Sequence, residues 1–161
     1  DRAAELNPAI KSQIPSDLMR VADAAEEAKN HETALALAKK AFDLDPVNSY
    51  LCGRIGAALA NLERYPEAVE YYRKAVTLNS RQEYTYRMLN DAFIKMNADL
   101  VAEWRRIVVD QPDSALGHCF LGQTLAASGD AAGAVAELQT AAQLDPVSPM
   151  IKSKLQELQP K

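Results

Sequence analysis

One pattern of small and large side chains recurs along this chain at intervals of about 34 residues. Three columns of equivalent positions show it, and the successive offsets within each column are 34, 32 and 34 residues. The columns are Ala34, Ala68, Leu100 and Ala134; Ala38, Tyr72, Trp104 and Leu138; and Ala41, Ala75, Ile107 and Ala141. A unit this short cannot bury a core of its own, so the units are expected to stack on one another.

Each unit is predicted to contain two amphipathic helices. The columns above lie in its second half, and its first half carries apolar residues at positions i, i+3, i+4 and i+7, which is one stripe of a 3.6-residue helix. In the second repeat that stripe is Cys52, Ile55, Gly56 and Leu59. Gly129 suits the left-handed conformation that ends a helix, and Asp130 suits the cap of the next one. The chain is therefore predicted to be all-α.

At these positions the chain resembles the tetratricopeptide-repeat (TPR) family, over about residues 15–146. The resemblance implies a right-handed α-solenoid of helix-turn-helix repeats with a C-terminal capping helix. The expected repeats and cap are at about 15–48, 49–82, 83–114, 115–148 and 149–161. Residues 1–14 are expected to form an N-terminal segment: Ala3, Leu6 and Pro8 fit the tail of an upstream repeat and fit a chance short helix equally well.

The third repeat departs from the pattern. It is two residues short between Phe93 and Leu100, and it carries Asn90 and Leu100 where the other repeats favour small residues. Small residues let paired helices approach closely, so the helices of this repeat are expected to pack less closely than the others.

Composition argues against two classes of function. The net charge of −4 does not suit nucleic-acid binding, which usually needs a basic stripe. A helical-repeat RNA binder of the pentatricopeptide kind also fits poorly, because Trp104, beside Arg105 and Arg106, falls in a core column. No apolar run approaches the ~20 residues that span a bilayer, so direct membrane insertion is not expected.

Residues that carry chemistry are few. His118 falls at a core position, and His31 is expected to be exposed in a turn. The acidic residues Asp23, Glu26 and Glu27 share one helical face, which fits a solvated surface better than a cation site. No motif for catalysis, phosphate binding or zinc is present. The sequence therefore predicts a protein that is not an enzyme, with no catalytic residues, no cofactor and no metal.

The two cysteines, Cys52 and Cys119, lie on first helices two repeats apart, beyond the reach of a disulfide. Two unpaired thiols favour a reducing compartment such as the cytoplasm.

In the TPR family the first helices line a concave groove that receives an extended peptide or a helix. Carried onto this chain, the resemblance implies a partner-binding groove made of Met19, Asp23, Tyr50, Gly53, Ala57, Tyr84, Arg87, Asp91, Lys95, Leu116 and Gln123. Tyr50, Tyr84 and Leu116 then form a ladder of interface anchors, unless the tyrosines merely pack between neighbouring first helices. The acidic first repeat predicts an apolar peptide or amphipathic helix whose basic end lies over it. A clamp for heat-shock-protein carboxylates is not expected, because Arg54 alone has the required chemistry.

The leading hypothesis is a non-enzymatic scaffold or adaptor whose partner is another protein. One alternative is a specialised chaperone or assembly factor for a bacterial secretion, pilus or envelope complex, since the alanine-rich repeats look bacterial. Another is a self-associating module, that is, a homo-oligomer.

Overall fold

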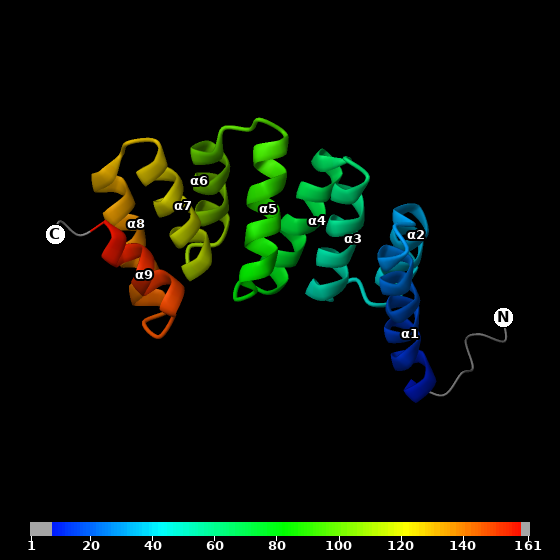
Figure 1. The fold of residues 1–161 in the computed structure, drawn as a ribbon. Coiled ribbons are helices and arrows are strands. Elements are labelled where there is room, and N and C mark those ends of the chain that lie inside the picture. The colour runs from blue at the N-terminus through cyan, green and yellow to red at the C-terminus, as the bar shows by residue number, and fades with distance from the viewer. Residues whose placement is uncertain (1–7, 159–161) are drawn as a thin grey trace. The chain divides into compact units, whose positions relative to one another are not determined.

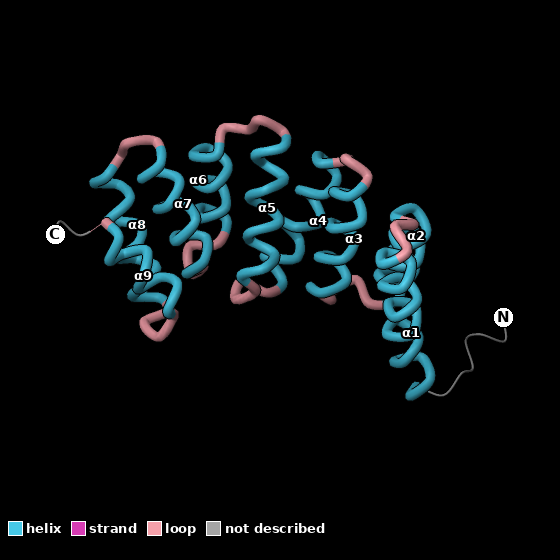
Figure 2. The backbone as a smooth tube through the Cα atoms, viewed as in Figure 1, coloured by secondary structure: helices cyan, strands magenta, loops and turns pink. Residues whose placement is uncertain are grey.

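The computed structural model describes the backbone of residues 8–158 and the side chains of residues 13–158. Every regular element in this range is an α-helix (Figure 1), and short loops join the helices (Figure 2). The helices are α1 Pro8–Glu27, α2 His31–Leu44, α3 Ser49–Asn61, α4 Tyr65–Leu78, α5 Glu83–Lys95, α6 Leu100–Asp110, α7 Ala115–Ala127, α8 Ala131–Leu144 and α9 Pro149–Glu157. The predicted all-α class is confirmed for these residues. No helix among them is both long and apolar enough to cross a membrane.

The chain forms two compact units, Asp1–Leu78 and Asn79–Lys161, called unit 1 and unit 2 below. The described part of unit 1 holds α1–α4, and that of unit 2 holds α5–α9. In unit 1, α1 pairs with α2, α2 packs on α3, and α3 pairs with α4. In unit 2, α6 packs on α7, α7 pairs with α8, and α8 packs on α9. Within each unit, helices adjacent in sequence are therefore also adjacent in space.

Paired helices approach closely where the sequence provides a glycine opposite a large side chain. A Cβ atom built on Gly56 of α3 would lie 2.7 Å from two ring atoms of Tyr72 on α4. A Cβ atom on Gly122 of α7 would lie 2.8 Å from Cγ of Leu138 on α8. Tyr72 and Leu138 are both fully buried. These contacts confirm the prediction that small residues set the spacing of the helix pairs.

Helix ends follow the predicted signals at the turn before α8. Gly129 has φ +91°, in the left-handed region, and Asp130 Oδ1 accepts the backbone N–H of Gly133 at 2.9 Å. A positive φ recurs at the equivalent place in every repeat. The residues that have it are Lys29, Glu63, Asn97 and Gly129.

The third helix pair differs from the others in the predicted way. Helix α6 has 11 residues, whereas α2, α4 and α8 have 14 each. Leu100 is the first residue of α6, while its counterparts Ala34, Ala68 and Ala134 each lie one turn inside their helices. Helices α5 and α6 pack least closely of the four pairs, which confirms the expectation for this repeat.

Large aromatic side chains fill the interior beside this loose pair. Trp104 of α6 stacks on Phe120 of α7, with ring centroids 4.9 Å apart, and on Tyr86 of α5 at 6.0 Å. Trp104 Nε1 donates a hydrogen bond to Asn90 Oδ1 at 3.1 Å, and Tyr86 Oη lies 2.6 Å from Ser114 Oγ. Trp104 is fully buried, as its core column predicted.

At the N-terminus, α1 begins at Pro8 and continues through Pro15, near which the sequence placed the start of the first repeat. Proline has no backbone N–H, so one i→i−4 hydrogen bond of α1 is absent there. The suggested tail of an upstream repeat, with Ala3 and Leu6, falls outside the described residues.

Candidate partner-binding surface

Three helices of unit 2 line a surface hollow of about 380 Å³. Helix α7 contacts both α5 and α9, so residues from these three helices meet. The hollow is lined by Glu83, Arg87, Asn90 and Asp91 from α5, Phe120 and Gln123 from α7, and Met150 and Lys154 from α9. It combines two acidic and two basic side chains with an aromatic ring and a thioether, which suits a ligand with both polar and apolar groups.

A second hollow, of about 490 Å³, adjoins the first and shares Asn90, Phe120 and Gln123 with it. Its other lining residues come from the α5–α6 turn, the start of α6 and the end of α7: Ala98, Asp99, Leu100, Val101, Thr124, Ala127 and Ser128. This second hollow exists because α6 begins late. Helices α2, α4 and α8 each have a first turn that α6 lacks, and the missing turn leaves space.

Most polar side chains of the second hollow already bind within the protein. Asn90 Oδ1 accepts from Trp104, Thr124 Oγ1 donates to the carbonyl of Phe120 at 2.8 Å, and Ser128 Oγ donates to the carbonyl of Leu125 at 2.9 Å. Asp99 Oδ1 accepts from the backbone N–H of Ala102 at 3.0 Å and caps α6. The surface left for a ligand is therefore formed largely by Leu100, Val101 and Phe120, and it favours an apolar side chain.

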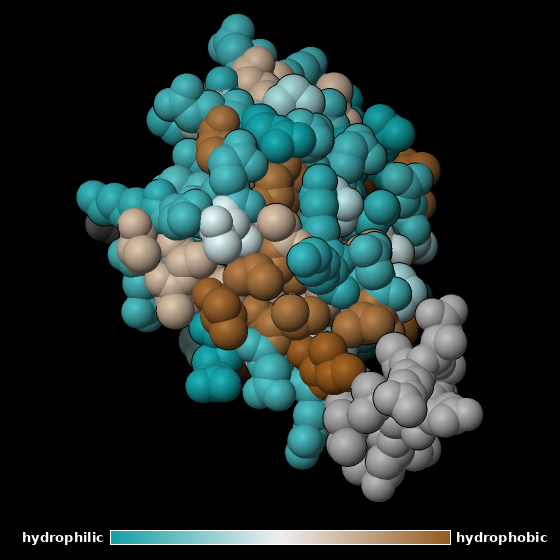
Figure 3. All heavy atoms as spheres, turned by 90° about the vertical axis from the view of Figure 1, so that its right-hand side faces the viewer, coloured by the Kyte–Doolittle hydropathy of each residue, from teal (hydrophilic) through white to brown (hydrophobic). Residues whose placement is uncertain are grey.

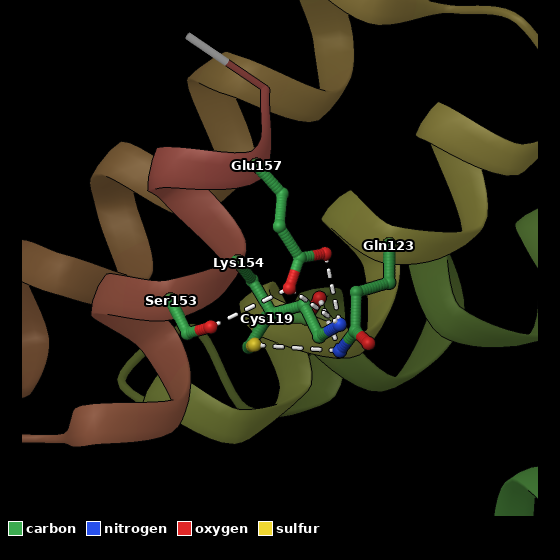
Figure 4. A network of polar contacts seen from close by, with 5 residues as sticks. All are labelled: Cys119, Gln123, Ser153, Lys154 and Glu157. Atoms are coloured by element: carbon green, nitrogen blue, oxygen red, sulfur yellow. Dashed lines mark hydrogen bonds and ion pairs between the residues drawn. The ribbon is translucent and has the colours of Figure 1, made fainter.

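The polar contacts in and beside the first hollow lie within single helices, some within α9 and some within α7 (Figure 4). Lys154 Nζ lies 3.0 and 3.1 Å from the two carboxylate oxygens of Glu157, and Ser153 Oγ lies 3.4 Å from one of them. Gln123 Nε2 donates to the carbonyl of Cys119 at 3.3 Å. Among the described residues, Arg87 and Asp91 form no ion pair, so both remain available to a partner.

Burial keeps the two thiols of the chain away from solvent and unreactive. Cys52 and Cys119 are free and fully buried. Burial raises the pKa of the Cys119 thiol to about 11, against a smaller lowering by the amide of Gln123, and burial likewise raises the pKa of Cys52. Both groups stay protonated near neutral pH, and a protonated thiol is a poor nucleophile and metal ligand. In the described part of the chain, no three His, Cys, Asp or Glu side chains lie together as a metal site requires.

Residues predicted for the groove in unit 1 are mostly engaged within the protein. Met19 is buried, and the carboxylate of Asp23 forms an ion pair with Arg54 of α3. Glu26 Oε2 lies 2.7 Å from His31 Nδ1 and accepts from Asn61 Nδ2 at 3.0 Å. The expectation of an exposed His31 is wrong, because Glu26 holds it half-buried. The acidic face predicted to receive a basic ligand already has basic and polar partners of its own.

The three residues of the predicted ladder of anchors differ in their exposure to solvent. Tyr50 in unit 1 is 47% exposed and Tyr84 in unit 2 is 57% exposed, whereas Leu116 is buried and lines a different hollow. Leu116 is therefore not a free anchor. Gly53 and Ala57 are half-buried on α3, and Lys95 is exposed at the end of α5.

Of the predicted residues, the structure brings Arg87, Asp91 and Gln123 together in one hollow of unit 2. Sequence reasoning missed Phe120, Met150 and Lys154, although the repeat spacing contains the signal. Met150 follows Leu116 by 34 residues, and Lys154 follows Phe120 by 34, so α9 stands where a fifth first helix would stand. A helix that only caps the last repeat would not contribute to a groove, but α9 supplies both Met150 and Lys154 to this one.

Comparison with known proteins agrees with this arrangement. Two family models, each described as tetratricopeptide repeat, match residues 49–82 and 101–149, which together make about half of the chain. A curated relative, small glutamine-rich tetratricopeptide repeat-containing protein 2 of Mycosarcoma maydis, is 35% identical over 82 residues. That match covers 51% of this chain and 22% of the relative, so the chain spans less than a quarter of that protein.

Solved structures share the fold at low sequence identity. MamA is 16% identical with a TM-score of 0.56, over 91% of this chain and 81% of its own. TTC0263 of Thermus thermophilus is 20% identical with a TM-score of 0.54, over 89% and 80%. YrrB is 20% identical with a TM-score of 0.53, over 88% and 74%. These likenesses confirm the predicted α-solenoid of helix-turn-helix repeats, and with the family matches they show that this chain is a tetratricopeptide-repeat protein.

Proposed function

We propose that this protein is a non-enzymatic scaffold or adaptor, which binds a peptide or helix of a partner protein in the hollow between α5, α7 and α9. Tetratricopeptide repeats are generally interaction modules without catalysis. The observation that carries the proposal is that three helices of unit 2 gather Arg87, Asp91, Gln123 and Met150 around one hollow of about 380 Å³.

The chemistry of this hollow suits a polypeptide. Arg87 and Asp91 supply one unpaired charge of each sign, and the amide of Gln123 offers an oxygen to a backbone N–H. Phe120 and Met150 add apolar surface, and the adjoining hollow at Leu100 offers room for a bulky apolar side chain. Tyr84 lies one turn from Arg87 on α5 and is exposed, as an interface anchor should be. A peptide-binding site is described for YrrB, which shares the fold.

The experiment is a pull-down from an extract of the source organism, read by mass spectrometry, with four baits. They are the wild-type chain, Arg87→Glu/Gln123→Ala, Tyr84→Ala, and the control Arg106→Glu. Arg106 is an exposed arginine of α6 that lines neither hollow, so the control matches the charge change. Circular dichroism first shows that all four are equally helical.

We expect the wild type and Arg106→Glu to retain the same amount of the same partner. The amount retained by Arg87→Glu/Gln123→Ala and by Tyr84→Ala should be lower by about ten-fold or more. A partner that all four forms retain equally contradicts binding in this hollow. A partner lost equally with Arg106→Glu points to a general charge effect and also contradicts it.

The bacterial origin and the role in assembling a secretion, pilus or envelope complex stay predictions from the family resemblance. The identity of the captured partner tests them directly, since an exported subunit would favour an assembly factor over a general adaptor.

A further inference from the structure

Two side-chain amides lie where the two hollows of unit 2 meet. Asn90 of α5 lines both hollows together with Phe120 and Gln123 of α7, and we call these three half-buried residues the α5–α7 seam. Hydrophobic atoms also gather on the side of unit 1 that carries α1 and α2 (Figure 3), but apolar surface alone does not define the chemistry of a ligand. Hydrogen-bonding groups of fixed orientation do define it.

The orientation of the Asn90 amide is set by Trp104. Trp104 Nε1 donates to Asn90 Oδ1 at 3.1 Å, and an indole nitrogen can only donate, so the oxygen of this amide faces Trp104. Trp104 is fully buried and stacks on Phe120, which holds the donor in place. Asn90 Nδ2 forms no hydrogen bond within the described part of the chain, so its two N–H groups remain as donors for a ligand.

The Gln123 amide presents the complementary group. Its Nε2 donates to the carbonyl oxygen of Cys119 at 3.3 Å and lies 3.5 Å from Cys119 Sγ (Figure 4). A carbonyl oxygen can only accept, so the nitrogen of this amide faces the backbone of α7. Gln123 Oε1 accepts no hydrogen bond from the described residues and remains as an acceptor for a ligand.

A free donor and a free acceptor at one seam match the backbone of another chain. A backbone C=O can accept from Asn90 Nδ2, and a backbone N–H can donate to Gln123 Oε1. In an α-helix these backbone groups are already paired except at the two ends, whereas an extended segment leaves them free. The seam therefore favours an extended segment over a helix.

The two hollows suit the side chains of such a segment. The second hollow, beside Leu100 and Val101, favours an apolar side chain. In the first hollow, Arg87 and Asp91 form no ion pair among the described residues and suit a charged or polar side chain. Neighbouring side chains of an extended segment point to opposite sides, so one segment bound at the seam can reach both hollows.

We propose that the partner segment is extended, that Asn90 and Gln123 bind its backbone, and that one of its bulky apolar side chains enters the second hollow. This inference rests on the proposed function and goes further, because it selects an extended peptide over a helix and gives Asn90 a binding role. The amide donor belongs to the third repeat alone, since the counterparts of Asn90 in the other repeats are Ala22, Gly56 and Gly122.

Short random peptides displayed on phage are the probe, because an extended segment needs no folded partner. Peptides that bind the wild-type chain are synthesised, and their dissociation constants are measured by isothermal titration calorimetry. We expect them to share one bulky apolar residue next to a polar one, without the i, i+3, i+4 spacing of an amphipathic helix.

Asn90→Asp tests the donor. Aspartate keeps an oxygen for Trp104 Nε1 and replaces the donor group with a second acceptor, so the helicity should stay unchanged while the dissociation constant rises about ten-fold or more. Gln139→Glu is the matched control. It makes the same change from amide to carboxylate at an exposed position of α8 that lines neither hollow, so the affinity should stay unchanged.

Ester substitution in the peptide tests the acceptor, because an ester removes one backbone N–H at a time without added bulk. One position should lose about five-fold or more in affinity for the wild type. The same ester should cost little in Gln123→Met, which has no acceptor to lose.

Each contrary outcome separates this inference from the proposed function. Peptides that lose affinity with Arg87→Glu but tolerate Asn90→Asp and every ester overturn the inference and leave binding in the first hollow in place. Equal losses with Asn90→Asp and Gln139→Glu overturn it too. A library without any binder also overturns it, although the pull-down could still support an adaptor. Peptides that tolerate Arg87→Glu, Tyr84→Ala and Asn90→Asp alike contradict both proposals.

Discussion

Single residues set the distance between the paired helices. Gly56 faces the ring of Tyr72, and Gly122 faces Leu138, so in both pairs the missing side chain of one helix makes room for a large side chain of the other. The size of the residue matters more here than its helix propensity, since glycine in a helix interior costs about 1 kcal/mol relative to alanine.

We expect Gly56→Ala to destabilise unit 1 by about 1–2 kcal/mol. The new methyl group would lie 2.7 Å from a buried ring that has little room to move, and overpacking of this kind costs about 1–3 kcal/mol, which outweighs the gain in helix propensity. Urea unfolding followed by circular dichroism measures the change.

The double variant Gly56→Ala/Tyr72→Leu is the control. Leucine lacks the ring atoms that meet the methyl group, so the cost of the double variant should fall clearly below the sum of the two single costs. Strict additivity would mean that the close contact with Tyr72 is not the cause.

The sequence predicted these residues because each contact follows from one column of the repeat. Gly56 and Trp104 could be placed inside from their columns alone. The pairing of Asp23 with Arg54 and of Glu26 with His31 could not, because such contacts depend on side-chain conformations and on the offset between helices, which a column does not record. The sequence therefore predicts a free acidic face on α1, whereas in the structure Asp23 pairs with Arg54 and Glu26 contacts His31.

At the scale of helices, one short element shapes the candidate site. The sequence predicted that the third pair packs loosely, and the position of the missing residues decides where the space opens. The first turn of α6 is absent, so the space lies beside Leu100 and Phe120 at the α5–α6 turn. The hollow itself could not be predicted. The repeat spacing shows how many residues the third repeat lacks, but it does not show which end of which helix lacks them.

Helix α9 has two roles that a substitution can separate: it covers the core of unit 2 and it lines the candidate groove. Ile151 is fully buried against Leu138 and Ala141, so Ile151→Ala should destabilise unit 2 by about 2–4 kcal/mol. Lys152 is exposed on the same helix, and Lys152→Ala should change the stability by less than about 0.5 kcal/mol. Fluorescence of Trp104 during urea unfolding measures both, and similar effects of the two variants would contradict the capping role of α9.

At the scale of the whole chain, the division into two units has a consequence for unfolding. Unit 1 and unit 2 are each compact, and in a repeat array the stability of each part depends on its own helices and on its nearest neighbours. The only tryptophan, Trp104, is buried in unit 2, while circular dichroism detects the helices of both units. Two probes therefore distinguish the two units without any label.

We expect Gly56→Ala to move part of the circular-dichroism transition to lower urea and to leave the midpoint of the Trp104 fluorescence unchanged. Ile151→Ala should lower the fluorescence midpoint and leave the contribution of unit 1 in place. The physical reason is that each substitution removes packing energy from one unit, and local unfolding follows local stability. If either variant shifts both probes together, the chain unfolds as one cooperative body, and the coupling between the units then exceeds the stability difference that one substitution introduces.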